Sequence, residues 1–223
     1  MLSDLLGINF WETVLKAAGF SLGRLLATYL ICLIISLIIA IWLASSQKAE
    51  KIAVPVFDLV QNIPPLAFYP VAALLFIKTG LIEGAAVFVL FTVMLWPLLF
   101  GLIGAVRQIP GDIKYAARIF GANGLKYVSY IILPAVFPVI VTSSIVSWGI
   151  GWNLLVVAEW IRYGRTSLQL QGLGGLLNKA ASGTAVDVPL FVVTLLVILL
   201  LVFLIHYFIW RPLLKVSERY KFD

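Results

Sequence analysis

The fold is decided by the stretch VPLFVVTLLVILLLVFLIHYFIW, residues 188–210, which carries no charged side chain over the length of a membrane-spanning helix. The rest of the chain has the same character. Hydrophobic residues make up 62% of its 223 residues, charged residues make up 12%, and the mean hydropathy is +1.08. Soluble domains carry about 25% charged residues, and a domain of this size has too little interior to bury such an excess of apolar side chains. The composition excludes a disordered chain, a fibrous protein and a disulfide scaffold, and predicts an integral membrane protein.

Uncharged runs of about twenty residues or more occur five times. They are residues 25–47, 59–77, 84–106, 127–158 and 188–210. Lipid offers the backbone no hydrogen-bond partner, and no segment alternates polar and apolar residues as a barrel strand does, so each run is predicted to be helical. The predicted fold class is an all-α membrane protein with five transmembrane helices.

The runs divide the chain into residues 1–24, 25–210 and 211–223. The first part contains Phe10 and Trp11 beside charged residues and is expected to be an N-terminal interfacial segment; the alternative is a terminus that continues directly into the first span. The second part is the expected transmembrane domain. Its outer loop, residues 159–187, is too long for a tight turn and is expected to hold a short helix. The third part is the expected cytoplasmic tail.

The basic residues predict the orientation in the membrane, because Lys and Arg concentrate in cytoplasmic loops. Ten of the 16 lie in residues 48–51, 107–126 and 211–223, which share one side of a chain with five spans. The expected protein is therefore a multi-pass component of the cell membrane, with its N-terminus outside and its C-terminus in the cytoplasm. The N-terminus lacks the basic region of a cleaved signal peptide, so the first apolar run is expected to direct insertion.

Polar residues and prolines interrupt the second apolar run. Asp58, Gln61 and Asn62 share one helical face, because they are separated by three and four residues. Pro64 and Pro65 follow, and because they lack backbone N–H groups they are expected to kink or unwind the helix. Irregular backbone at membrane depth is tolerated where it lines protein or a water-filled cavity. These five residues are therefore candidates for one wall of a translocation path; a hydrogen-bonded contact between helices is the alternative.

Three other residues could carry chemistry. Glu159 closes the fourth apolar run and is expected either to cap that helix at the outer interface or to point into a cavity or gate of the path. Cys32 and His206 are the only cysteine and the only histidine, and they lie too far apart in the sequence to form a metal site. No histidine is placed to serve a serine nucleophile. No catalytic residue and no metal site is predicted.

The most basic internal loop, residues 107–130, contains a spaced pattern that extends into the fourth run. It reads Tyr115-Ala116-Ala117, three residues, Gly121, nine residues, and Ile131-Ile132-Leu133-Pro134. This pattern resembles the EAA loop of ABC importer permeases, E-A-A-x3-G-x9-I-x-L-P, with tyrosine in place of the first glutamate. In that family the loop inserts into a cleft of the ATP-hydrolysing subunit. The resemblance implies that this coupling loop and the helix after it dock an ATPase through Tyr115, Ala116, Ala117, Arg118, Gly121, Leu133 and Pro134.

The residues of the coupling loop predict its local structure independently. Asp112 can cap a short helix, and Gly121 allows the left-handed conformation that ends one. A second short helix can begin near Gly124. The product would be a compact helix–turn–helix presented to a soluble partner; an ordinary loop between spans is the alternative.

The resemblance extends beyond the coupling loop. The segments QNIPPLAFYP (residues 61–70), Val157-Ala-Glu159 and Gly172-Leu-Gly174 are similar to the nitrate/sulfonate/taurine branch of these permeases. The resemblance implies a five-helix type I permease core. It also implies three kinds of partner: two ABC ATPase subunits, a second permease copy or paralogue, and an extracytoplasmic solute-binding protein. Lipid surrounds such a protein, and nucleic acid is not an expected partner.

The leading functional hypothesis is a permease subunit of an ATP-driven importer for a small anion or a sulfonate-, nitrate- or taurine-like solute. The chain contains no G-x4-G-K-S/T sequence, so no cofactor is expected on it, and ATP and Mg are expected on the ATPase subunits. It is not expected to be an enzyme itself. The alternative is a small secondary transporter or channel driven by an ion gradient, for which Asp58 and Glu159 are the candidate intramembrane carboxylates.

Overall fold

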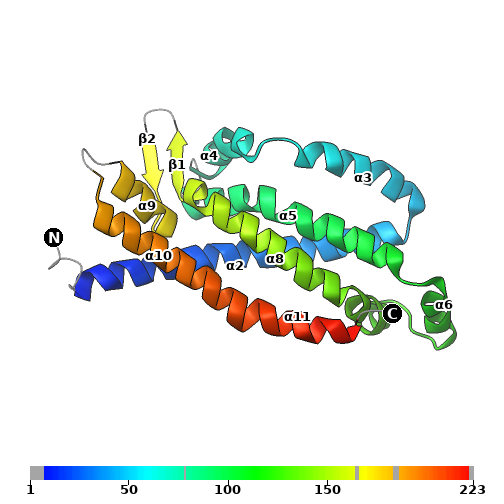
Figure 1. Cartoon of the computed structure of the whole chain (residues 1–223). Coiled ribbons are helices and arrows are strands. Elements are labelled where there is room, and N and C mark those ends of the chain that lie inside the picture. The colour runs from blue at the N-terminus through cyan, green and yellow to red at the C-terminus, as the bar shows by residue number, and fades with distance from the viewer. Residues whose placement is uncertain (1–7, 78, 164–165, 183–185, 221–223) are drawn as a thin grey trace.

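The structure is a computed structural model that describes residues 8–77, 79–163, 166–182 and 186–220. Long helices lie side by side along one direction and form an elongated bundle (Figure 1). Ile8 lies at one end of the bundle, which also carries a short β-hairpin, and Tyr220 lies at the other, which also carries the coupling loop. We call these the hairpin end and the loop end.

Four long helices build the bundle. They are α2 (Ile8–Ala44), α5 (Ile82–Gln108), α8 (Leu133–Ala158) and α10 (Val188–Ile205). Two of these helices are extended by short helical segments without a break. α7 (Leu125–Tyr127) and η2 (Val128–Ile132) lead into α8. α10 continues into η3 (His206–Trp210), α11 (Arg211–Ser217) and η4 (Glu218–Tyr220). With these continuations, four helices of the described chain are long and apolar enough to cross a membrane.

The second apolar run, residues 59–77, is not a single helix. It contains the end of α3 (Gln47–Gln61), which begins well before the run, followed by η1 (Pro65–Phe68) and α4 (Tyr69–Ile77). The two halves are bent by 87° relative to each other. Pro64 precedes η1 and Pro65 opens it, so the prediction of an interrupted helix at the prolines is confirmed. Counting this bent pair as one span gives the five predicted.

The boundary expected near residue 24 is absent from the structure. The described N-terminal residues form one helix that runs from Ile8 to Ala44 and also contains the first apolar run. Val14, Ala17 and Ala18 are buried against Leu173, so the start of this helix packs on protein. The alternative, a terminus that continues directly into the first span, describes these residues better than a separate interfacial segment.

The hairpin end departs from a purely helical fold. After α8 the chain forms β1 (Trp160–Tyr163) and β2 (Thr166–Gln169), which pair antiparallel with Trp160 opposite Gln169. It then forms α9 (Leu173–Ala181), which confirms the short helix expected in the outer loop. The fold class is otherwise as predicted: helices dominate, and this hairpin is the only sheet among the described residues.

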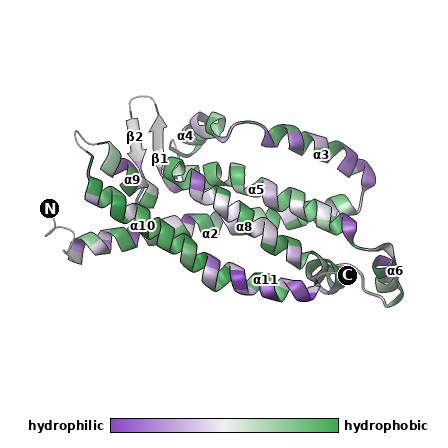
Figure 2. Ribbon diagram, in the orientation of Figure 1, coloured by the Kyte–Doolittle hydropathy of each residue, from purple (hydrophilic) through white to green (hydrophobic). Residues whose placement is uncertain are grey.

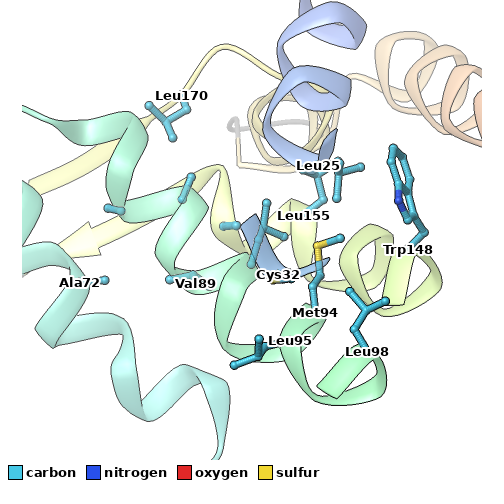
Figure 3. Packing of buried hydrophobic residues seen from close by; sticks show 14 of the residues in the cluster. Leu25, Cys32, Ala72, Val89, Met94, Leu95, Leu98, Trp148, Leu155 and Leu170 are labelled. Atoms are coloured by element: carbon cyan, nitrogen blue, oxygen red, sulfur yellow. The ribbon is translucent and has the colours of Figure 1, made fainter. Parts of the chain in front are cut away.

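The core lies where α2, α5 and α8 pack together. Leu25, Met94 and Leu155 come from these three helices and are completely buried (Figure 3). Ser147 Oγ donates a hydrogen bond of 2.7 Å to the carbonyl of Met94, and a Cβ on Gly151 would lie 2.9 Å from side-chain atoms of Leu25 and Met94. Small residues thus let the helices approach closely, as is typical of membrane bundles, where dispersion contacts drive packing.

The surfaces of α10 and α3 contrast in polarity (Figure 2). α10 is apolar throughout, and exposed side chains such as Leu196 and Phe203 cover its outer face. This surface suits lipid. By contrast, α3 is amphipathic: Ala53 and Phe57 pack on the core, while Lys51 and Asp58 are exposed. A charged face at this position suits water rather than hydrocarbon.

Candidate coupling loop and translocation path

The coupling loop folds as the predicted helix–turn–helix. Its first helix is α6 (Gly111–Ile119), with Asp112 in the first turn, and its second is the short α7. Gly121 has φ +72° and Gly124 has φ +55°, so both occupy the left-handed region that residues with a Cβ rarely adopt. These two glycines allow the chain to reverse between the helices, as the sequence predicted.

The predicted docking residues lie at different depths. All three of the first docking residues lie on α6: Tyr115 and Ala116 are exposed, whereas Ala117 is on the buried face of this helix. Leu133, at the start of α8, is exposed and Pro134 beside it is half-buried. The side chain of Arg118 lies outside the described residues.

The tip of the coupling loop exposes large apolar side chains. Phe120 and Leu125 are each 87% exposed, and Ile119 is 68% exposed. These residues precede and follow the turn of the coupling loop, whose helix α6 lies at the loop end of the bundle (Figure 1). Exposed apolar clusters of this kind mark interaction sites. Sequence reasoning placed Phe120 on an apolar helical face but did not identify it as part of the exposed tip.

Polar contacts tie the coupling loop to the spans beside it. Arg107, at the end of α5, forms an ion pair with Glu50 in the first turn of α3. Lys114 Nζ lies 3.4 Å from the carbonyl oxygen of Val106. The sequence contains both partners of the ion pair, but nothing in their spacing indicates that they meet. A displacement of the loop can therefore be passed directly to α3.

The structure brings the predicted path residues together at the end of α3. Gln61 Nε2 donates a hydrogen bond of 2.7 Å to Asp58 Oδ1, and Asn62 Nδ2 donates one of 2.6 Å to the carbonyl of Asp58. Pro64 and Pro65 follow at the bend. Asp58, Asn62 and Pro64 are exposed, so this polar segment faces outward from the isolated chain.

A cleft of about 590 Å³ lies beside the bend, between α3, α5 and α8. Gln61 and Pro65 line it together with Thr92, Trp96 and other residues of α5 and α8. The hydroxyl of Thr92 and the indole N–H of Trp96 donate hydrogen bonds to carbonyls of α5, and most of the other lining residues are apolar, so the cleft has few polar groups and no charged lining residue. Sequence reasoning missed Thr92 and Trp96, because their uncharged span carried no local signal.

Glu159 does not lie on this cleft. Its side chain is completely buried at the hairpin end, and both of its oxygens accept hydrogen bonds from protein. Oε1 accepts from Ser21 Oγ at 2.6 Å and from Arg24 Nη1 at 2.7 Å. Oε2 accepts from the backbone N–H groups of Gly174 at 2.7 Å and Gly175 at 3.3 Å. The placement of Glu159 on the path is corrected accordingly, because its carboxylate holds the first turn of α9 rather than facing a cavity.

Arg24 extends this arrangement to α5. Its guanidinium is buried, and it makes two parallel hydrogen bonds to Glu83, from Nε at 2.5 Å and from Nη2 at 2.8 Å. Ser21 Oγ in turn accepts a hydrogen bond of 2.9 Å from the amide of Leu173. We call Ser21, Arg24, Glu83 and Glu159 the hairpin-end network; it joins α2, α5, α8 and α9.

The charges of the hairpin-end network compensate one another. Burial raises the pKa of the Glu159 carboxyl, while the hydrogen bond from Ser21 and the charge and hydrogen bond of Arg24 act in the opposite direction. Every donor around Glu159 is an N–H or O–H group directed at a carboxylate, which is the arrangement that allows a charge to be buried. Ser21, Arg24 and Glu83 were absent from the sequence-predicted site, because ion pairs between distant segments have no local signature.

Glycines make room for this network. A Cβ on Gly172 would collide with the carboxylate of Glu159, and a Cβ on Gly174 would lie 2.6 Å from the Cα of Val156. The segment Gly172-Leu-Gly174 is therefore needed for α9 to approach the end of α8. In the described part of the chain, no three His, Cys, Asp or Glu side chains gather as a metal site would require.

The bundle of long apolar helices, the broken second span and the coupling loop together define a multi-pass α-helical membrane protein. The chain belongs to the family of binding-protein-dependent transport system inner membrane components, whose model matches residues 32–215. The resemblance stated from the coupling loop is confirmed by this match, and the chain is a multi-pass membrane protein.

Individual relatives support the same branch of permeases. The bicarbonate transport system permease protein CmpB of Synechococcus elongatus is 31% identical over 155 residues, which cover 70% of this chain and 53% of that protein. The nitrate import permease protein NrtB of Leptolyngbya laminosa is 29% identical over the same shares. A putative ABC transporter permease protein of Methanocaldococcus jannaschii is 27% identical over 87% of this chain and 73% of its own length. The chain spans about half the length of the first two relatives.

Proposed function

We propose that this chain is the transmembrane subunit of an ATP-driven importer, and that its coupling loop docks an ATPase subunit. The exposed apolar tip of that loop carries the proposal: Phe120 and Leu125 project at the loop end, held by a turn that needs glycine at positions 121 and 124. An exposed cluster of this kind requires a partner. The choice of an ATPase as that partner is supported by the resemblance of the loop to the EAA loop of ABC importer permeases and by the ABC transporter permease of Methanocaldococcus jannaschii among the relatives.

The implied assembly contains two permease copies or paralogues, two ATPase subunits that hold ATP and Mg, and an extracytoplasmic solute-binding protein. The cleft beside the bend supports the second permease, because residues of α3, α5 and α8 line it and the neighbouring polar residues Asp58 and Asn62 are exposed in the single chain. A facing subunit would close the path. The chain itself would bind no cofactor, and its C-terminus and coupling loop would face the cytoplasm.

The coupling loop can drive the path mechanically. Closure of the ATPase subunits would displace the loop, and the Arg107–Glu50 ion pair would pass that displacement to the start of α3. α3 meets α4 at an 87° bend where Pro64 and Pro65 remove backbone donors, so this is the joint at which α3 can move. Movement there would open the cleft to one side of the membrane and then to the other.

The proposed solute is a small anion. Its support is the bicarbonate and nitrate transport named for the relatives, together with the branch-like residues 61–70. Gln61 is the lining side chain whose amide could donate a hydrogen bond to such an anion, and no lining residue carries a fixed charge. Such a lining suits passage rather than tight binding, and it leaves selection among anions to the solute-binding protein.

The coupling role is tested with Gly121→Val in vesicles that contain the complete purified assembly. A Cβ-branched residue at φ +72° distorts the turn, so we expect ATP-dependent uptake to fall at least tenfold while membrane insertion is kept. Gly111→Val is the matched control, since Gly111 lies in the same loop, lacks the left-handed φ and has open space around its Cβ position. Equal uptake by wild type and Gly121→Val would contradict the proposal. Uptake by the chain alone, driven by an ion gradient, would favour a secondary transporter.

A further inference from the structure

A second cavity lies at the loop end, apart from the cleft beside α3. It has a volume of about 580 Å³ and lies between the coupling loop and the adjacent ends of the spanning helices. Ile41 and Ala44 of α2 and Val106 of α5 form its wall on the side of the bundle. We call it the inner pocket. It does not share lining residues with the cleft proposed as the translocation path.

The inner pocket is amphipathic. Its bundle side is apolar and includes Ile132 of η2 in addition to the residues already named. Its loop side carries three groups that can donate hydrogen bonds: the ammonium of Lys114, the amide of Asn123 and the hydroxyl of Tyr127. An occupant that matched both sides would combine an apolar body with a head that accepts hydrogen bonds.

The charge of the inner pocket is positive. Lys114 is half-buried, its only recorded hydrogen bond is the long one to Val106, and its ammonium forms no ion pair with a carboxylate of the described residues. None of the residues lining the pocket is acidic. Of the acids on the neighbouring elements, Glu50 of α3 is already paired with Arg107, and Asp112 of α6 is exposed and does not line the pocket. The head of the occupant is therefore expected to be an anion.

We propose that the inner pocket binds an anionic phospholipid, with an acyl chain against Ile41, Ala44 and Val106 and the phosphate near Lys114. The pocket lies where α2 and α5 end, and so at the boundary between hydrocarbon and water, where such lipids are available. Of the two most exposed tip residues, Leu125 lines the pocket and Phe120 does not, so an ATPase seated on Phe120 would lie beside the pocket. Binding there would brace the coupling loop against the spans. This inference requires only a membrane-embedded chain and does not rest on the proposed transport.

The test compares lipids of different charge around the full-length protein, purified with the subunits that accompany it. Phosphatidylglycerol is added to nanodiscs of phosphatidylcholine, and the thermal unfolding midpoint and the lipid retained after delipidation are measured. We expect phosphatidylglycerol to raise the midpoint and to be retained. Lys114→Gln should bind it about fivefold more weakly, because a lysine near anionic headgroups contributes on that order. Val128→Phe, which fills the pocket without changing charge, should also lower retention.

The control variant is Lys179→Gln, which removes an exposed lysine of α9 at the hairpin end. It should retain the lipid like the wild type. Equal retention by Lys114→Gln and wild type would overturn the proposal. So would a soluble headgroup, glycerol 3-phosphate, that raised the midpoint as much as the lipid does. A photoreactive residue at Ala122 should capture lipid, and capture of protein alone would assign the pocket to the interface with a partner subunit.

Discussion

The hairpin end and the loop end of the bundle differ in whether contacts within this chain satisfy their side chains. At the hairpin end, Arg24 and Glu159 are buried charges, and each is satisfied by groups of this same chain. At the loop end, Phe120 and Leu125 are apolar side chains that the chain leaves exposed. A buried and fully paired network fixes four helices in one arrangement, whereas an exposed apolar turn gains stability only when a partner covers it. The hairpin end is therefore stabilised by contacts within this chain, whereas the loop end is expected to be stabilised further by a partner subunit.

The largest effect is expected from Glu159→Gln at the hairpin end. The substitution keeps the shape of the side chain but removes the buried one of the two carboxylates that pair with Arg24, and replaces one of the two oxygens that accept from Ser21, Arg24 and the amides of Gly174 and Gly175 with an N–H donor. Breaking a buried pair costs about 3 kcal/mol or more, so the free energy of unfolding in detergent micelles should fall by that amount. Glu83→Gln is the matched control, because the side chain of Glu83 is 59% exposed and its loss should cost far less.

The coupling between the two buried charges sharpens this prediction. If Arg24 and Glu159 stabilise each other, the double variant Arg24→Gln with Glu159→Gln should cost less than the sum of the two single substitutions. Unfolding midpoints of the four proteins measure the difference. If the losses of unfolding free energy in the two single variants add up to the loss in the double variant, Arg24 and Glu159 do not stabilise each other.

At the loop end, Phe120→Ala should leave folding unchanged and weaken assembly. The side chain is 87% exposed in the single chain, so its removal costs the fold little. Aromatic residues at the centre of an interface often contribute about 2 kcal/mol or more, so the amount of ATPase that co-purifies should drop about tenfold or more. Phe203→Ala, on the lipid-facing surface of α10, is the control and should leave co-purification intact.

The glycines at the hairpin end give a smaller, purely steric test. Gly174→Ala would place a Cβ 2.6 Å from the Cα of Val156, and the backbone there cannot yield without moving α9. Overpacking of this kind costs about 1–3 kcal/mol, which the unfolding midpoint would register. Gly149→Ala, at a helical position with open space around its Cβ, should be neutral or slightly stabilising. Similar midpoints for the two variants would show that α9 is loosely held.

The smallest effect on stability is expected from Glu50→Gln, which breaks the ion pair with Arg107. The Arg107 side chain is half exposed, and surface pairs contribute about 0–1 kcal/mol, so the unfolding midpoint should barely move. Uptake per ATP hydrolysed should nevertheless fall if the pair passes loop motion to α3. An unchanged ratio would place the connection between loop and path elsewhere, and Lys51→Gln, an exposed charge one residue further along α3, controls for the loss of charge.

Local sequence features predicted most of the coupling loop and the broken span. Gly121 was identified from the conformational freedom of glycine, and Pro64 and Pro65 from their missing N–H groups. In both cases the decisive property belongs to one residue and its immediate neighbours. The sequence left open whether Glu159 caps its helix or faces a cavity, because a carboxylate at the end of an apolar run carries no information about what surrounds it; the structure places it at the cap of α8. Thr92 and Trp96 were missed because nothing in the sequence of an uncharged span distinguishes the side chains that line a cleft from those that face lipid or the core. The packing of the helices determines which ones line it.

The sequence by itself determined that this chain enters a membrane, how many spans it offers, where one of them breaks and which loop is spaced for a partner. Those properties follow from hydrophobicity, backbone geometry and short-range spacing, which can be summed along the chain. The tertiary structure alone decided that Arg24 meets Glu159 across 135 residues and Glu83 across 59, and that Glu159 serves the fold rather than the path. The energy of a buried charge depends on the groups within a few ångströms of it, and those groups are brought together only when the helices pack.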